Sequence, residues 1–255
     1  AKMDMDDRFA NGAYIADGDA YPDKWAREAG AFRKTARCDL DVAYGGSPRQ
    51  VMDIFYPSGA PKGLLMFVHG GYWLAFDKSV WSHLAAGAVA RGYAVAMPSY
   101  DLCPKVQISD ITAQITQAAQ FAAARVAGPL RFAGHSAGGH LVARLAGQDW
   151  GGRLARVMPI SPVADLEPLL QTSMNAQLGL DLAHARAESP VHMAPPQVPV
   201  TVWVGADERP VFVEQATALA KLWRCDLVQA AGAHHFNVIA PLADPDSAMT
   251  RTLFS

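Results

Sequence analysis

The sequence predicts an α/β fold with a mostly parallel central sheet and helices on both of its faces. Short continuous apolar runs, typical of strands buried on both sides, alternate along the chain with segments whose apolar residues recur at helical spacing. Such an alternation favours parallel strands joined by crossover helices. The length of 255 residues suffices for one large domain with its own core. We therefore expect a single domain over residues 1–255.

The expected elements follow an N-terminal segment, residues 1–36, which holds a helix near Asp23–Phe32. Strands are expected over Asp39–Tyr44 and Gln50–Tyr56, as a hairpin, and then over Gly63–Val68, Tyr93–Met97, Leu130–Ala133, Ala155–Ile160, Val200–Val204 and Asp226–Gln229. Helices are expected over Ser79–Arg91, Ile108–Val126, Ala137–Gly147, Pro210–Trp223 and near Asp246–Leu253. Residues 161–199 are Pro-rich and break the alternation, so we expect them to form a cap-like insertion over the functional site.

Composition and charge exclude several classes of partner. The chain has 22 basic and 24 acidic residues and no long run of Lys or Arg, so we expect no nucleic acid. Its longest apolar runs are too short to cross a membrane. Three widely spaced cysteines and an acidic, polar N-terminus predict reduced thiols, no signal peptide and a cytoplasmic location. The expected partner is a small-molecule substrate, with a homodimer left open.

A nucleophile motif lies at the centre of the sequence. Gly134-His135-Ser136-Ala137-Gly138 matches G-x-S-x-G, follows the strand at Leu130–Ala133 and opens the helix at Ala137. A sharp strand–turn–helix is where the exposed serine of an α/β-hydrolase lies, and small flanking residues allow the tight turn. The free N–H groups of the helix N-terminus would point toward developing negative charge. We interpret Ser136 as a catalytic nucleophile, against the alternative of a capping serine in a Gly-rich helix start.

A second glycine-rich loop follows the strand at Gly63–Val68. Its sequence, from His69 to Trp73, is HGGYW. Acyl transfer needs two or three backbone N–H groups aimed at the tetrahedral oxygen. We expect the N–H groups of Gly71 and Tyr72 to act with that of Ala137 as an oxyanion hole, and Gly70 to shape the turn.

The general base and its acid follow the nucleophile in the order Ser, acid, His. Gly205-Ala206-Asp207-Glu208 follows a predicted strand and offers two acids; the G-x-x-(D/E) spacing favours Glu208, and Asp207 stays open. Gly232-Ala233-His234-His235 follows the last strand; the G-x-x-H spacing favours His235, with His234 second. No histidine has clear metal-ligand spacing, so we expect no metal and no cofactor.

These motifs together resemble the arylformamidase (kynurenine formamidase) group of the α/β-hydrolases, a neighbour of the hormone-sensitive-lipase-like esterases. The resemblance rests on HGGYW, GHSAGGH and GAHHFNVI, with Trp73 as the discriminating residue. The segment GADERPVFVEQ also resembles that group's G-x-x-(D/E)-x-P-x-F-x-x-Q, which implies Glu208 as the acid and His235 as the base.

The resemblance implies a serine hydrolase that attacks an N-formyl aryl amide or a short-chain ester, acting on a C–N or a carboxylic ester bond. A broad carboxylesterase is the alternative. A non-catalytic binding protein on the same fold is disfavoured, because all three catalytic roles are filled. We place Trp73 and His135 among the substrate-binding residues. Tyr72, Phe76 and Trp81 could also line an aryl pocket, although core packing explains such aromatic residues equally well.

Overall fold

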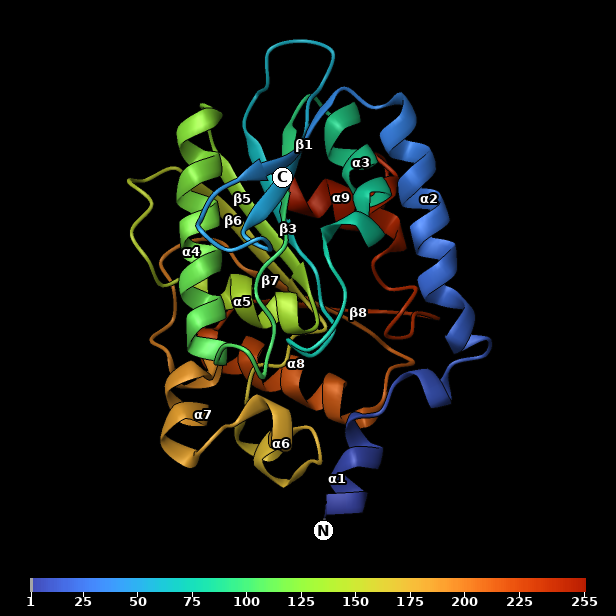
Figure 1. Cartoon of the computed structure of the whole chain (residues 1–255), viewed down its shortest axis with the longest axis vertical. Helices are drawn as coiled ribbons and strands as arrows, with labels where there is room; N and C mark the ends of the chain where they lie inside the picture. Colours follow the sequence, from blue (N-terminus) through green and yellow to red (C-terminus); the bar gives the residue numbers. More distant parts are fainter. Residues whose placement is uncertain (1) are drawn as a thin grey trace.

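Eight strands form one sheet in the order β1-β2-β4-β3-β5-β6-β7-β8 (Figure 1). The computed structural model describes residues 2–255. The strands are β1 (Cys38–Ala43), β2 (Val51–Phe55), β3 (Leu64–Val68), β4 (Ala94–Pro98), β5 (Leu130–His135), β6 (Leu154–Ile160), β7 (Thr201–Gly205) and β8 (Asp226–Ala230). β1 and β2 are antiparallel, and β2 also pairs antiparallel with β4. All pairs from β4 to β8 are parallel, which confirms the predicted α/β fold.

Helices cover both faces of the sheet. One face packs against α4 (Ile108–Arg125), α5 (Ala137–Leu145) and α8 (Pro210–Trp223), and the other against α2 (Tyr21–Thr35), α3 (Ala86–Ala90) and α9 (Ala248–Leu253) (Figure 1). Alternate residues of β3 serve the two cores: Met66 packs into the first and Phe67 into the second. A strand with cores on both sides must be apolar throughout, which is why the buried strands read as continuous apolar runs.

The helix expected over Ser79–Arg91 is shorter in the structure. Two 3₁₀ turns, η3 (Lys78–Val80) and η4 (Ser82–Ala85), precede α3, which begins only at Ala86. Arg33 on α2 explains the break, because its Nη1 donates to the Ser79 carbonyl at 2.5 Å and to Ser82 Oγ at 2.8 Å. Trp81, between the two turns, has φ −125° and leaves the helical region. A long-range contact therefore replaces the helical hydrogen bonds that the local sequence would favour.

The segment between β6 and β7 is irregular, as its sequence indicates. It holds η5 (Glu167–Gln171), α6 (Asn175–Leu178), α7 (Leu182–Glu188) and η6 (Pro190–His192). The chain begins with α1 (Lys2–Phe9), η1 (Gly12–Tyr14) and η2 (Gly18–Ala20), which the sequence analysis did not predict. We call residues 2–20 the N-terminal strap. α1 contacts η5 and α8, so the strap and the β6–β7 segment meet at one end of the molecule (Figure 1). The last turn before α9 is η7 (Ala240–Ala243).

Two further findings concern the hydropathy of the helices and the state of the cysteines. Within residues 2–255, no helix is both long and apolar enough to span a bilayer. Cys38, Cys103 and Cys225 are all free thiols. Burial raises the pKa of the Cys103 and Cys225 thiols to about 11, which keeps both protonated and poorly nucleophilic.

Candidate active site

Ser136 stands at the sharp turn between β5 and α5. Its backbone has φ 60° and ψ −115°, a conformation that non-glycine residues rarely adopt. The glycines of the motif allow this turn, because a Cβ on Gly134 would lie 2.2 Å from the Gly138 carbonyl oxygen and one on Gly138 would lie 2.0 Å from that of Val68. The turn brings helix α5 directly against β3. It also presents Ser136 Oγ at the carboxyl edge of the parallel strands.

Ser136, His235 and Glu208 form one hydrogen-bonded row. His235 Nε2 lies 3.1 Å from Ser136 Oγ, and His235 Nδ1 lies 2.5 Å from Glu208 Oε1. All three side chains are buried. Glu208 accepts a hydrogen bond from Nδ1–H, so in the neutral ring the proton stays on Nδ1. The ring therefore presents an unprotonated Nε2 to the serine hydroxyl, as a general base requires.

Glu208 is held at both of its oxygens. Oε2 accepts the Ser161 hydroxyl at 2.5 Å and the Gly205 N–H at 2.6 Å. Burial acts to raise the pKa of Glu208, but the neighbouring His235 and these hydrogen bonds outweigh it and hold the pKa below its ordinary value. Asp207, the alternative acid, is exposed, and its backbone N–H donates to the Ala233 carbonyl at 2.9 Å. The structure therefore places Glu208, and not Asp207, against the histidine.

His234 faces away from the serine. Its Nδ1 accepts the backbone N–H groups of Phe236 and Asn237, at 3.1 and 3.2 Å, which makes its Nε2 the donor to the Tyr21 hydroxyl at 3.2 Å. These contacts shape the loop that carries His235. His234 thus shapes the loop, and both of its ring nitrogens bond to groups other than Ser136.

The loop after β3 runs beside Ser136. A Cβ on Gly70 would lie 2.7 Å from the His135 carbonyl oxygen, so this loop passes very close to the nucleophile turn. Gly71 has φ 113°, and Tyr72 (φ 54°) and Trp73 (φ 59°) follow in the left-handed region. Within residues 2–255, the N–H groups of Gly71 and Tyr72 donate to no other group. The Ala137 N–H belongs to the first turn of α5, where helical N–H groups have no partner in the helix.

His69 fixes the start of this loop. Its ring stacks on Tyr100, with 4.5 Å between centroids, and its Nδ1–H donates to the Gly70 carbonyl at 2.7 Å. The Tyr100 hydroxyl donates to the His69 carbonyl at 2.7 Å. Burial lowers the pKa of His69 to about 4, so the ring stays neutral at neutral pH.

Ser161 and Tyr100 are thus supporting residues that the sequence analysis missed. Only the position of Ser161, directly after β6 and beside the acid-bearing end of β7, could have indicated its role.

Trp73 does not reach the substrate cavity, contrary to our expectation for this residue. Its side chain is fully buried in the core, and its Nε1–H donates to His140 Nδ1 at 3.3 Å. His140 Nε2–H in turn donates to the Glu188 carbonyl at 2.8 Å. The successive left-handed residues of the loop turn Trp73 under helix α5. This tryptophan therefore anchors the loop to helix α5 through His140.

His135 lies at the cavity but makes a protein contact. Its Nε2–H donates to the His235 carbonyl at 2.8 Å, and its ring lies 4.7 Å from that of His235. Burial and, to a smaller extent, His235 lower the pKa of His135 to about 3. A neutral His135 therefore positions the base from the residue next to the nucleophile.

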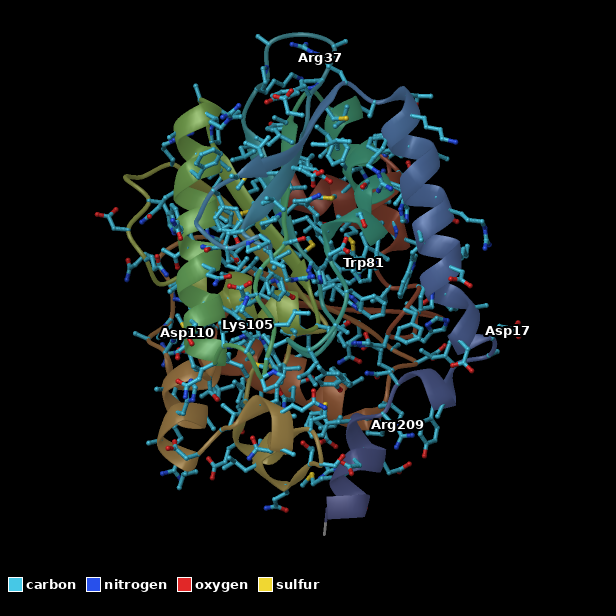
Figure 2. All side chains as sticks on the ribbon, viewed as in Figure 1. Asp17, Arg37, Trp81, Lys105, Asp110 and Arg209 are labelled. Atoms are coloured by element: carbon cyan, nitrogen blue, oxygen red, sulfur yellow. The ribbon has the colours of Figure 1, made fainter. Side chains whose placement is uncertain are left out.

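A cavity of about 410 Å³ opens onto Ser136 and His235. Its wall is largely aromatic and apolar, and it includes Phe9, Trp25, Tyr72, Phe76, Trp81, Met174 and Phe236. Figure 2 shows Trp81 between α2 and the sheet. The β6–β7 segment adds Ser173 and Met174, whereas the strap adds residues 6 and 9–12. The larger share of the covering wall therefore comes from the N-terminus, which the sequence analysis did not foresee.

One group of side chains within the described residues has spacing suited to a metal ion: Asp165, Glu167 and His192. None of them lines the cavity at Ser136. Glu167 is also paired with Arg186 at 3.3 Å. The chemistry at Ser136 is served by residues outside this group.

Comparison with known proteins identifies relatives of this chain. The BD-FAE family model matches residues 52–156. Kynurenine formamidase of Drosophila melanogaster is 31% identical over 238 residues, which cover 82% of this chain and 78% of that protein. The Salmo salar enzyme of the same name is 27% identical and covers 87% of this chain and 82% of its own length.

Solved structures give the same fold. A protein from a Silicibacter species, described provisionally as a thioesterase, has a TM-score of 0.97 and 52% identity, covering 98% of this chain and 99% of its own. An esterase from Pyrobaculum calidifontis has a TM-score of 0.69 at 18% identity, with 94% and 90% covered. The second likeness concerns the fold alone.

Proposed function

Since this chain belongs to the kynurenine formamidase family of α/β-hydrolases, we propose that it hydrolyses a small N-formyl aryl amide or a short-chain ester with Ser136 as nucleophile. The observation that carries the proposal is the row of hydrogen bonds from Ser136 Oγ through His235 to Glu208. It provides a serine with a neutral imidazole to take its proton and a carboxylate to stabilise the imidazolium that results.

Each step of the reaction has a residue to serve it. Ser136 Oγ attacks the carbonyl carbon of the substrate while its proton passes to His235 Nε2. The N–H groups of Gly71, Tyr72 and Ala137 hold the negative oxygen that forms. His235 then returns the proton to the leaving amine or alcohol, and the C–N or C–O bond breaks. Water attacks the acyl-serine by the same route and releases formate or another small acid.

The cavity supports an aryl leaving group. Its aromatic wall offers flat surfaces for ring packing, and such contacts add to the free energy of apolar burial. A broad carboxylesterase is the second candidate, favoured by the same apolar wall, which would accept many small acyl esters.

Relative specificity constants separate the two candidates. We expect kcat/KM for N-formyl-L-kynurenine to exceed that for p-nitrophenyl acetate and p-nitrophenyl butyrate once the higher intrinsic reactivity of the activated esters is divided out. The Ser136→Ala variant supplies the background rate for each substrate. Ester hydrolysis with no measurable turnover of the formamide would assign the chain to the carboxylesterases.

A further inference from the structure

The cavity carries one fixed carboxylate, that of Asp6 on the N-terminal strap. Asp6 is the sole Asp or Glu among the lining side chains within the described residues, and it is half-buried. Its Oδ1 accepts the Ser173 N–H at 2.7 Å, which ties the strap to the β6–β7 segment. Among the side chains described, those of residues 4–255, none bonds to its Oδ2. One oxygen of Asp6 therefore remains available at the cavity wall.

Among the side chains of residues 4–255, no Lys or Arg pairs with Asp6. Among residues 4–255, the cavity lining includes no Lys or Arg. Two arginines at the strap pair with other carboxylates: Arg8, within the strap, with Glu214 at 3.4 Å, and Arg209 with Asp7 at 3.2 Å. Figure 2 shows Arg209 beside the C-terminal end of α1. His135 stays neutral because burial lowers its pKa to about 3. The fixed charge that a bound substrate meets is therefore negative.

A second acceptor lies on the same strap. Asn11 also lines the cavity and is only 9% exposed. Its Nδ2 is directed to the Phe9 carbonyl at 3.5 Å, and its Oδ1 has no partner within residues 2–255. The Oδ1 atom is itself buried, so the charge on this wall comes from Asp6 and not from Asn11.

We propose that Asp6 is a specificity-determining residue that selects substrates with a cationic group on the aryl leaving group and disfavours those with an anionic group. The inference rests on the proposed function, in which the acyl group is small and the aryl group occupies the cavity. Water screens a half-buried carboxylate on only part of its surface, so Asp6 attracts a nearby cation and repels a nearby anion. The aromatic faces of the same cavity also favour a quaternary ammonium ion over a carboxylate.

Three acetate esters that differ in charge test the proposal: 3-(trimethylammonio)phenyl acetate, phenyl acetate and 3-acetoxybenzoate. For each ester, kcat/KM of Asp6→Asn is divided by that of the unmodified enzyme, which cancels the intrinsic reactivity of the ester. Asparagine keeps an oxygen for the Ser173 N–H and removes the charge, with an NH2 group in place of the second carboxylate oxygen. Asp4→Asn is the matched control, because Asp4 is exposed on the same helix and does not line the cavity.

We expect Asp6→Asn to lower kcat/KM for the cationic ester by about tenfold, to raise it for the anionic ester by a similar factor and to leave the neutral ester within about twofold. Asp4→Asn should change each value by less than about twofold, since exposed charges interact weakly. An equal change for all three esters, or an equal pattern in Asp4→Asn, would overturn the proposal. The ester series does not depend on formamide hydrolysis, so a failure of the formamidase assignment remains separately visible.

Discussion

The ring of His135 lies 4.7 Å from the ring of His235. The Nε2–H of His135 also donates to the backbone carbonyl of His235. The residue that precedes the nucleophile therefore holds the base. This contact joins the turn after β5 to the loop after β8, two segments that lie 100 positions apart along the chain.

Loss of this contact should disturb catalysis more than binding. We expect His135→Phe, which keeps an aromatic ring but removes the donor, to lower kcat by about tenfold with KM little changed, because His235 loses its alignment. His135→Gln retains a side-chain N–H and should recover part of the rate. Steady-state kinetics on phenyl acetate checks both variants. Equal kcat for His135→Phe and the unmodified enzyme would show that the contact has no role in alignment.

Removal of the nucleophile should abolish turnover. We expect Ser136→Ala to lower kcat by at least about a thousandfold, since the covalent route is lost. Circular dichroism and thermal unfolding establish that the variant is folded. A folded variant that keeps a tenth of the activity would contradict the serine mechanism.

The adjacent histidines should separate into a catalytic and a structural residue. We expect His235→Ala to remove most of the rate. His234→Ala should retain most of it but unfold at lower temperature, because Phe236, Asn237 and Tyr21 lose a hydrogen-bond partner. Measurement of kcat/KM and of Tm on both variants checks this. Greater loss of rate in His234→Ala would assign the base to the other ring.

The adjacent acids should separate in the same way. Glu208→Gln removes the charge that stabilises the imidazolium and should lower kcat severely. Asp207→Asn changes an exposed side chain and should leave kcat within about twofold. Both variants replace a carboxylate by its amide, so the ratio of their kcat values reports which residue is the catalytic acid. A severe loss in Asp207→Asn would refute this assignment.

Three buried histidines should make the protein less stable in weak acid. Burial lowers the pKa of His69 to about 4 and those of His135 and His140 to about 3, against about 6.5 for unfolded histidine. Below pH ~6.5 the unfolded chain therefore binds protons that the folded chain does not, so stability is full above that pH and falls as the pH drops.

The expected slope is up to three protons, each worth about 1.4 kcal/mol of unfolding free energy per pH unit. Urea unfolding at pH 7, 6 and 5 measures it, above the range where most carboxylates titrate. His140→Gln should reduce the slope by about one proton. An unfolding free energy that is constant from pH 7 to pH 5 would be inconsistent with neutral buried rings.

Much of this architecture follows from local sequence. The strands have cores on both sides, so their apolar runs mark them directly. The close approach of α5 to β3 requires the glycine at position 138, and the close approach of β5 to the start of α5 requires the one at position 134. Spacing alone could rank Glu208 above Asp207 but could not decide, because the decision comes from Ser161 and His235, which lie 47 and 27 positions away along the chain.

Other features depend on contacts that local patterns do not encode. The break between residues 79 and 86 depends on Arg33 from another helix. Trp73 fits an aryl pocket by its chemistry, but three consecutive positive φ angles direct it into the core. The strap was not predicted because α1 is short and polar, and its place is set by distant partners such as Ser173 and Arg209.

The pairing of Trp25 and Trp81 at the cavity gives this protein an internal optical reporter. Their rings lie 5.3 Å apart, and both line the space that faces Ser136. When a ligand fills the cavity, it therefore replaces water beside two of the six tryptophans of the chain. Intrinsic fluorescence can thus follow the arrival of an aryl molecule in the Ser136→Ala variant, where occupancy is observed without turnover.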